Sequence, residues 1–452
     1  MKLIPVILAA GHGTRMRSKT PKMLHPLAGQ PLVMHALRNV AAVTEEPPVV
    51  VVGFGEDAVR QAVGTAARFA VQQPQLGTGH AVMAAEELAA GQGDLVLVTY
   101  ADMPLLKPQT IARLVELQKD NPGPISMLTV VLDDPHGFGR VVRNADGTVR
   151  AIVEEAVANP QQLAIRELNA SVFCFRAEWL WPALHRIQVS PKGEYYLTDL
   201  VEIAVNDGLQ VRAVCTDDPT EAVGINTRVH LAEAEAILRK RINEQWMLAG
   251  VTIVDPATTF IEADVTLGQD TIVWPNTYLR GKTVIGENCY LGPDTIIESS
   301  QIGNSCRVLA SYIESSLLED EVRMGPFCHL RPGAHLAKGV KMGNFGEVKG
   351  SYLGPGTQMG HFSYIGDAQI GAKVNIGAGT ITCNYDGVHK HKTEIGDNAF
   401  IGSDSMLVAP LKIGNRAKTG AGSVVTHDVP DDGVVVGVPA RPFQKKVEEG
   451  GE

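Results

Sequence analysis

The sequence predicts an α/β protein built as an N-terminal domain with a mostly parallel sheet, a linker helix and a C-terminal parallel β-helix. Three observations support this fold class. Apolar runs alternate with helical patterns over residues 1–228, one helical period covers residues 229–249, and a six-residue period begins near Val251. We therefore expect domains at residues 1–228 and 250–452, joined by a linker helix at 229–249.

The composition is that of a globular protein. The chain has 452 residues, 44% of them hydrophobic, and a net charge of -10. Proteins whose main function is to bind nucleic acid or an anionic membrane usually present a basic surface. A net negative charge argues against such a function, so we expect neither partner. Six scattered cysteines without a C-x-x-C pair predict free thiols, and the start of the chain does not resemble a signal peptide. We expect a cytoplasmic protein.

The first part alternates predicted strands and helices. Apolar runs predict buried strands at Ile4–Ala10, Val49–Val52, Leu95–Tyr100 and Ile125–Val131. Helical patterns lie between or after them, at Pro31–Val43, Asp57–Ala67, Gly79–Ala90 and Gln109–Gln118. This alternation is typical of a parallel sheet covered on both faces, in which ligands bind at the carboxyl ends of the strands.

The second part has a different period. Apolar residues recur every three or four positions over 229–249 and predict one amphipathic helix of about six turns. Aliphatic–glycine pairs then recur at intervals of mostly five or six, as at Ile285–Gly286, Ile365–Gly366 and Ile401–Gly402. A hexapeptide repeat is the signature of a parallel β-helix. Residues Asn384–Thr393 interrupt it and are expected to form a protruding loop.

A glycine-rich loop follows the first predicted strand. Its sequence is Gly11-His12-Gly13-Thr14-Arg15-Met16, with Pro21-Lys22 shortly after. Glycines at this place let backbone N–H groups approach a phosphate, and the Arg15 and Lys22 side chains add positive charge. The loop fits neither the Walker pattern nor the dinucleotide fingerprint.

This motif resembles the signature of sugar-nucleotide pyrophosphorylases. The resemblance continues through Gln75-Leu76-Gly77-Thr78-Gly79-His80, Tyr100-Ala101-Asp102-Met103-Pro104, Gly137-Phe138-Gly139-Arg140, Val153-Glu154-Glu155, Glu167-Leu168-Asn169 and Gly224-Ile225-Asn226-Thr227. With the hexapeptide half included, nearly the whole chain is similar to the family of bacterial bifunctional N-acetylglucosamine-1-phosphate uridyltransferase/glucosamine-1-phosphate N-acetyltransferase. That family implies a Rossmann-like nucleotidyltransferase domain, a left-handed β-helix and a homotrimer.

The resemblance implies a site for UTP and the UDP-sugar in the N-terminal domain, with Asp102 and Asn226 as Mg²⁺ ligands. Carboxylate and amide oxygens suit this hard cation. Arg15 and Lys22 would neutralise phosphate charge during an in-line attack that needs no protein nucleophile. The residues expected to bind the nucleotide and sugar are Leu8, Ala9, Ala10, Gly11, Lys22, Gln72, Gly77, Thr78, Tyr100, Ala101, Asp102, Gly139, Glu154, Asn169 and Asn226. Of these, Gly139, Glu154 and Asn169 would hold the N-acetylglucosamine moiety.

Polar residues cluster on the predicted coils of the C-terminal half. The resemblance makes His361 the general base of acetyl transfer, a role that suits an imidazole with a pKa near neutrality. The glucosamine phosphate would be held by Arg331, Lys349, Tyr364, Asn375 and Lys390. Acetyl-CoA would be held by Ala378, Asn384, Tyr385, Ser403, Ala421 and Arg441. Glu347 is a candidate to orient His361, and Cys383 is expected to be a bystander.

One position departs from the family pattern, and two alternatives remain open. The family has a basic residue that contacts CoA where this chain has Val438, and the nearest cation is Arg441. One alternative is a pyrophosphorylase whose β-helix only assembles or regulates the protein. The other makes the β-helix a scaffold. The choice of UTP over dTTP and a metal at the acetyltransferase site are left open by the sequence.

Overall fold

The structure is a computed structural model that describes residues 1–133, 135, 138–155 and 158–443. Gly137, part of one family motif, lies outside the described residues. The chain divides into two compact units, Met1–Leu238 and Arg239–Glu452, with the boundary inside helix α9 (Arg228–Leu248). Among the described residues, every helix is too short or too polar to cross a membrane.

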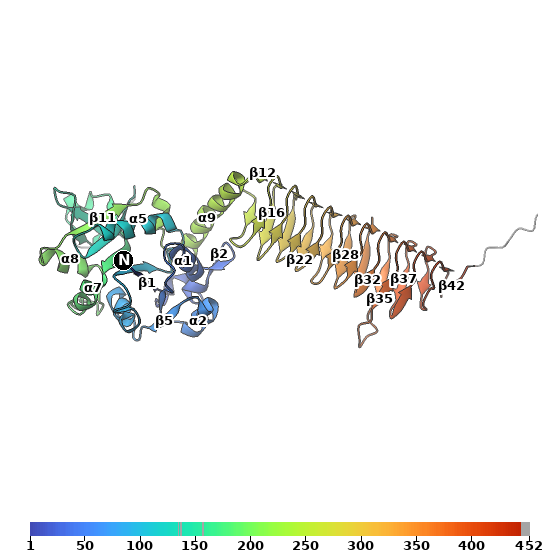
Figure 1. Cartoon of the computed structure of the whole chain (residues 1–452), viewed down its shortest axis with the longest axis horizontal. Coiled ribbons are helices and arrows are strands. Elements are labelled where there is room, and N and C mark those ends of the chain that lie inside the picture. Colours follow the sequence, from blue (N-terminus) through green and yellow to red (C-terminus); the bar gives the residue numbers. More distant parts are fainter. Residues whose placement is uncertain (134, 136–137, 156–157, 444–452) are drawn as a thin grey trace, which may run out of the picture. The chain divides into compact units, whose positions relative to one another are not determined.

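The first unit contains a nine-stranded sheet (Figure 1). Its main path runs β11-β7-β10-β6-β1-β4-β5. The bounds are β1 Leu3–Leu8, β4 Val49–Val52, β5 Arg68–Val71, β6 Leu95–Tyr100, β7 Ile125–Val131, β10 Glu167–Arg176 and β11 Val211–Cys215. Off this path, β8 (Arg140–Arg143) pairs with β10, and β9 (Val149–Val153) pairs with β8. The four predicted strands are present as β1, β4, β6 and β7. Only β10 breaks the parallel order of the main path, since it runs antiparallel to β6 and β7.

Helices follow the predicted pattern with one interruption. They are α1 Leu32–Ala41, α2 Glu56–Val63, α3 Thr78–Ala84, α4 Glu86–Ala89, α5 Pro108–Lys119, α6 Pro160–Leu163, α7 Ala177–Leu184 and α8 Asp199–Asn206. The single helix expected at Gly79–Ala90 is divided into α3 and α4 at Ala85. Strands β1 and β6 pair in parallel with Leu8 opposite Tyr100, so the loops after both strands leave the sheet at the same edge. That edge is where the first candidate site is built.

The second unit is a three-sided stack of short parallel strands (Figure 1). Successive strands along the chain enter three different sheets in turn. The first sheet runs from β12 (Thr252–Ile253) to β42 (Arg441–Pro442), the second from β13 (Phe260–Ile261) to β40 (Val424–Val425), and the third from β14 (Thr266–Leu267) to β38 (Leu411–Ile413). This is the predicted β-helix. All strand pairs named in these sheets are parallel except the last, β41 (Val434–Val436) with β42.

The repeat explains the core of the β-helix. The aliphatic residue of each hexad faces inward, and stacked residues such as Val348, Ile365 and Ile376 form one continuous buried cluster. Burial of this cluster stabilises the coils, because each coil alone has too little apolar surface to fold. Near the C-terminal end of α9, Ile242 and Trp246 pack against the same cluster. All six cysteines are free thiols, as predicted.

Candidate functional site

A cavity of about 530 Å³ opens at the carboxyl ends of β1 and β6. Most of the residues predicted to bind the nucleotide line it. They are Leu8, Ala10, Gly11, Lys22, Gln72, Gly77, Thr78, Tyr100, Asp102 and Asn226, and the predicted catalytic cation Arg15 lines the cavity with them. Ala9 and Ala101 are buried behind this lining, so only their backbones could serve a ligand. The motifs around Gly11, Gly77, Asp102 and Asn226, which are far apart in sequence, thus converge on one cavity.

Four charged or polar side chains meet in the cavity. The Lys22 ammonium donates hydrogen bonds to Asp102 Oδ2 at 2.5 Å and to Asn226 Oδ1 at 2.8 Å. Arg15 also donates to Asn226 Oδ1, at 3.0 Å. The Lys22 and Asp102 side chains are 7% and 19% exposed, so the pair is shielded from water. One small region therefore holds two cations and two oxygen ligands.

The two oxygens fit a shared cation. Asp102 Oδ2 and Asn226 Oδ1 both accept hydrogen bonds from the Lys22 ammonium, so the two oxygens point toward the same small volume. One carboxylate and one amide are a suitable donor set for Mg²⁺, which keeps several waters and uses substrate phosphates as further ligands. Among the described residues, His, Cys, Asp and Glu form no metal-binding group of three or more. The residues present thus fit the metal of the predicted nucleotide site.

Two glycines make room for this arrangement. Gly13 has a φ of +61°, and a Cβ there would lie 2.5 Å from Cβ of Lys22. Gly77 has a φ of +93°, and its Cβ would lie 2.6 Å from the backbone oxygen of Tyr195. Any other residue at either place would be strained and would displace the neighbouring segment. The glycines of the motifs therefore serve packing as well as ligand access.

Hydrogen bonds fix the wall around Gly77. The Gln72 amide donates to the Gly77 oxygen at 2.9 Å, and the Thr78 hydroxyl accepts from the backbone N–H of Leu197 at 3.0 Å. Burial raises the pKa of the Tyr100 phenol, which stays neutral at physiological pH. These side chains are positioned before any ligand binds.

Gly139, Glu154 and Asn169 form a separate group that does not line the cavity. The Asn169 N–H donates to the Gly139 oxygen at 2.9 Å, and a Cβ on Gly139 would lie 3.2 Å from a Glu154 carboxylate oxygen. Burial and the charges of Glu202 and Glu154 raise the pKa of Asp199 at the start of α8. The three residues predicted for the sugar are thus brought together, with a further carboxylate near them.

The sequence alone missed part of the cavity wall. Gln75, Glu194 and Tyr196 also line it. Gln75 belongs to a motif that was recognised, but Glu194 and Tyr196 lie in an irregular segment with no periodic signal. They reach the cavity because the Tyr195 oxygen accepts from the N–H of Gly79 at 2.8 Å.

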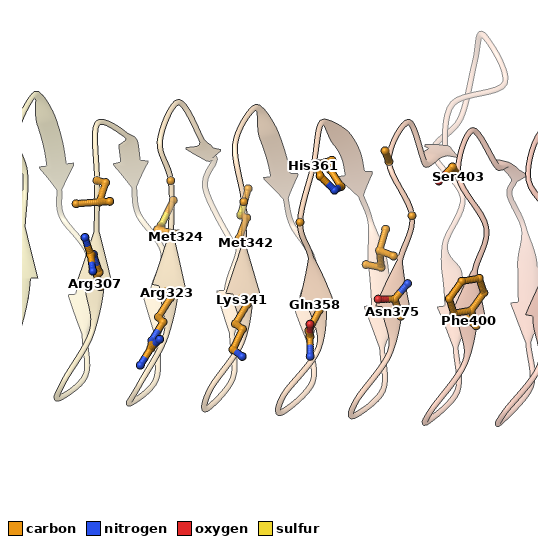
Figure 2. Close-up of a pocket in the computed structure, with 17 residues that line it drawn as sticks. Arg307, Arg323, Met324, Lys341, Met342, Gln358, His361, Asn375, Phe400 and Ser403 are labelled. Carbon is orange, nitrogen blue, oxygen red and sulfur yellow. The ribbon is translucent and has the colours of Figure 1, made fainter.

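A groove of about 600 Å³ runs along the first sheet of the β-helix (Figure 2). His361, Asn375, Ala378 and Ser403 line it. The register pairs Met359 with Ile376 and Ile376 with Ile401 in strands β30 (Gln358–Met359), β33 (Asn375–Ile376) and β36 (Phe400–Ile401). Residues two positions later occupy the same corner of successive coils, about 4.8 Å apart. His361, Ala378 and Ser403 thus form one row, and Ala421 continues it beyond β39 (Lys418–Thr419).

The residues predicted to hold the phosphate lie mainly on the second sheet. Arg331 follows β25 (His329–Leu330), Lys349 ends β28 (Gly346–Lys349), and Tyr364 lies in β31 (Ser363–Gly366). The Lys390 ammonium, together with Arg331, lowers the pKa of Lys349, so these three cations are close neighbours. Asn375 stands apart from them on the first sheet, beside His361. The predicted phosphate site is therefore divided between two faces of one chain.

The protruding loop carries further predicted residues. Asn384 and Tyr385 follow β34 (Ile381–Cys383), and Tyr385 pairs with Lys390 across the loop. The Tyr385 side chain is 60% exposed. Arg441 lies on β42, away from the groove lining, and the apolar Val438 is 73% exposed. Position 438 therefore carries an exposed apolar side chain where the family has a basic residue.

Glu347, the candidate to orient His361, and Cys383, the expected bystander, both lie in the second sheet. Glu347 accepts a hydrogen bond from Arg331 at 3.0 Å, and the His361 imidazole makes no hydrogen bond with the described residues. Glu347 is thus paired with Arg331, one of the cations predicted to hold the sugar phosphate, rather than with His361. Burial raises the pKa of the Cys383 thiol, which makes it a poor nucleophile, as expected for a bystander.

The sequence also missed the cations in the groove. Arg307, Arg323 and Lys341 stand in one column, because the register pairs them in consecutive strands of the first sheet (Figure 2). All three are exposed, and the Phe400 side chain lies further along the same lining. Their sequence spacing gives no signal, since the coils differ in length.

Comparison with known proteins agrees with this two-part architecture. Residues 5–187 match the MobA-like NTP transferase domain, and residues 264–299 and 392–427 match the bacterial transferase hexapeptide repeats. The bifunctional protein GlmU of Heliobacterium modesticaldum is 48% identical over 96% of this chain and 95% of that protein. The GlmU proteins of Shouchella clausii and Geobacillus thermodenitrificans are 44% and 45% identical, over 95% and 97% of this chain and 95% of each relative. The chain therefore belongs to the family of bifunctional GlmU proteins.

Proposed function

We propose that this chain carries two enzyme activities. The C-terminal site acetylates glucosamine 1-phosphate with acetyl-CoA, and the N-terminal site transfers UMP from UTP to the resulting N-acetylglucosamine 1-phosphate with release of pyrophosphate. The observation that carries the proposal is the presence of two separately built sites in a member of the GlmU family: the Lys22–Asp102–Asn226 cluster and the His361 groove.

In the N-terminal reaction two anions must meet. A phosphate oxygen of the sugar attacks the α-phosphorus of UTP in line, the bond to the pyrophosphate breaks, and pyrophosphate leaves. Arg15 and Lys22 lower the repulsion between the phosphates, and the shielded setting of Lys22 strengthens its attraction for them. Asp102 and Asn226 would hold Mg²⁺, which supplies neutralisation of phosphate charge when bound.

In the C-terminal reaction the sugar amine attacks the thioester carbonyl. His361 takes the proton that the amine loses, the C–S bond breaks, and the protonated His361 returns the proton to the departing sulfur, so that CoA leaves as the thiol. Arg331, Lys349 and Lys390 hold the sugar phosphate, because three neighbouring cations favour a dianion. The row formed by Ala378, Ser403 and Ala421 offers small side chains along which the pantetheine arm can lie.

We also propose that the β-helix assembles as a homotrimer. Phe327 and Phe345 are 62% and 59% exposed, stack at 5.5 Å, and both have a φ of +60°, a strained conformation for a bulky residue. Strained and exposed aromatic side chains indicate a surface that is covered in the working protein. Phe362, next to His361, is 54% exposed at the equivalent corner. Light scattering is expected to give three times the 48.4 kDa chain mass.

Two assays test the pair of activities. Thiol release from acetyl-CoA should require glucosamine 1-phosphate, and pyrophosphate release from UTP should require N-acetylglucosamine 1-phosphate. His361→Ala should abolish the first and spare the second, while Asp102→Ala should do the reverse. Running dTTP beside UTP tests the nucleobase. A trimer that releases pyrophosphate but no thiol would instead identify a pyrophosphorylase with a non-catalytic β-helix.

A further inference from the structure

The loop of residues 384–392 interrupts the β-helix between β34 and β35 (Thr393–Ile395). Figure 1 shows it standing away from the stack near β35. It carries Asn384, Tyr385 and Lys390, three residues assigned to the proposed acetyltransferase site. A reactive site needs its groups within a fraction of an ångström of their working positions, so something must hold such an excursion in place.

Asp367 contacts both ends of this loop. Its Oδ2 atom accepts a hydrogen bond from the Asn384 side-chain amide at 2.5 Å, where the loop begins. Its backbone oxygen accepts from the N–H of Thr393 at 3.3 Å, where the loop ends. Asp367 itself is tied to the coil below, since its N–H donates to the Lys349 oxygen at 3.1 Å. One residue therefore joins the loop, the body of the β-helix and the strand that carries Lys349.

The conformation of Asp367 suits this place. Its φ is +50°, in the left-handed region that aspartate and asparagine tolerate better than most residues. The neighbouring Gly366 lies directly beneath two side chains, because a Cβ there would come within 2.4 Å of the Tyr364 hydroxyl and 2.9 Å of the Asn384 amide nitrogen. The Asp367 carboxylate thus fixes Asn384 next to Tyr364.

The charge of Asp367 also matters to the cations. The Lys390 ammonium and the Arg331 guanidinium lower the pKa of Lys349, whereas the Asp367 carboxylate acts in the opposite direction. Without this carboxylate, the Lys349 ammonium would lose its proton at a lower pH. A deprotonated Lys349 would hold a phosphate dianion less well.

We propose that Asp367 is a positioning residue for acetyl transfer, which orients Asn384 and the loop and adds one negative charge to the cluster of Lys349, Arg331 and Lys390. The proposal rests on the acetyltransferase half of the proposed function. Asp367 acts through its neighbours and does not itself exchange a proton with substrate.

Two substitutions separate the roles of Asp367. Asp367→Gly removes the carboxylate but accepts the positive φ, and Asp367→Asn keeps a hydrogen-bond acceptor for Asn384 while removing the charge. A matched control is Asp294→Gly. Asp294 also has a positive φ, +52°, and accepts from the side-chain amide of Asn276 on the adjacent coil at 3.0 Å, but that pair lies outside both proposed sites.

Acetyl transfer, uridyl transfer and thermal unfolding are measured on the full chain. We expect Asp367→Gly to lower kcat/KM for acetyl transfer about 10- to 100-fold, with uridyl transfer unchanged. Asp367→Asn should keep kcat within about threefold at pH 7, a tolerance set by the retained hydrogen bond. In the pH profile of kcat/KM for glucosamine 1-phosphate, the fall at alkaline pH should begin at a lower pH in Asp367→Asn than in the unaltered chain. A purely structural role would not produce this change. Asp294→Gly should leave both activities as they are.

Three outcomes would overturn the proposal. One is acetyl transfer in Asp367→Gly equal to that in Asp294→Gly at every pH. Another is a parallel loss of both activities in an Asp367→Gly chain whose thermal unfolding is unchanged, which would show that the residue does not act on acetyl transfer in particular. If that variant does not fold, an unshifted alkaline limb in Asp367→Asn decides against the proposal. An unaltered chain that releases no thiol would refute the acetyltransferase itself, which is a different result.

Discussion

The ammonium nitrogen of Lys22 lies 2.5 Å from Oδ2 of Asp102, inside the cavity at the carboxyl ends of β1 and β6. Lys22 comes from a short 3₁₀ turn (Lys22–Leu24), and Asp102 follows β6. A residue assigned to phosphate neutralisation is thus paired with a residue assigned to the metal. A bound phosphate would attract the Lys22 ammonium away from the carboxylate, and Asp102 would then be available to hold the proposed Mg²⁺.

Lys22→Met is expected to reduce uridyl transfer about 100-fold or more, because it removes a preorganised and shielded positive charge from the reacting phosphates. Pyrophosphate release measures the loss, and thiol release from acetyl-CoA should be unchanged. Lys19→Met, an exposed change in the same loop, is the control and should keep full activity. Equal activity in the two variants would remove Lys22 from the mechanism.

The metal site makes its own prediction. Asn226→Leu removes one of two protein oxygens, so the Mg²⁺ concentration for half-maximal uridyl transfer should rise about 10- to 100-fold. Asn226→Asp keeps an oxygen in place and should need far less of an increase. A chelator should stop uridyl transfer in the unaltered chain. An unchanged Mg²⁺ requirement in Asn226→Leu would show that the ligands lie elsewhere.

The pattern of apolar residues in the sequence was enough to predict the strands that carry this site. Apolar runs gave β1, β4, β6 and β7, because a strand buried on both faces has no polar alternation to obscure it. Family motifs then indicated Lys22, Asp102 and Asn226 in one cavity. Their mutual hydrogen bonds depend on the path of the Gly13 loop, which no spacing reveals.

Other parts of the sites depend on tertiary contacts alone. Tyr196 enters the cavity wall through an irregular segment that docks on Gly79, and irregular segments carry no periodic signal. Asp367 reads in sequence as an ordinary turn residue, and only its contact with Asn384 gives it a role. Arg307 and Arg323 align because of the strand register, which turns of variable length hide in the sequence.

Gly77→Ala should damage the nucleotide site by displacing its wall. Gly77 has φ +93° and ψ -179°, a region open essentially to glycine alone, and the new Cβ would press on the Tyr195 oxygen. We expect uridyl transfer to fall at least about 10-fold, since shifts of about 1 Å in a wall can cost more than that. Acetyl transfer should be spared.

The control for Gly77 is Gly64→Ala. Gly64 has φ +62° and ψ -131°, which is also a glycine conformation, but a Cβ there meets nothing within 4 Å. Its cost of about 1–3 kcal/mol should appear in thermal unfolding without loss of activity. If both variants lost activity equally, backbone strain rather than displacement of Tyr195 would be the cause.

Arg143 and Glu167 should make the N-terminal unit sensitive to acid. The Arg143 guanidinium donates to both carboxylate oxygens of Glu167, at 2.8 and 2.6 Å, and Thr129 donates to one of them at 2.6 Å. Burial alone would raise the pKa of Glu167, but these hydrogen bonds from Arg143 and Thr129 outweigh it and lower the pKa. Glu167 begins β10, two residues before Asn169, so the pair also supports the predicted sugar site.

The sign follows from linkage. A carboxyl group whose pKa is lower in the folded state stabilises that state above its unfolded pKa of about 4.3. This contribution is lost as the pH falls through the lowered pKa. Arg143→Met should therefore cost about 1–2 kcal/mol of unfolding free energy near pH 7 and progressively less towards pH 3. Urea unfolding of the N-terminal unit within the full chain measures it. Arg150→Met, an exposed change on β9, should cost little at any pH, and a pH-independent cost in Arg143→Met would mean that packing of the Arg143 stem matters rather than its charge.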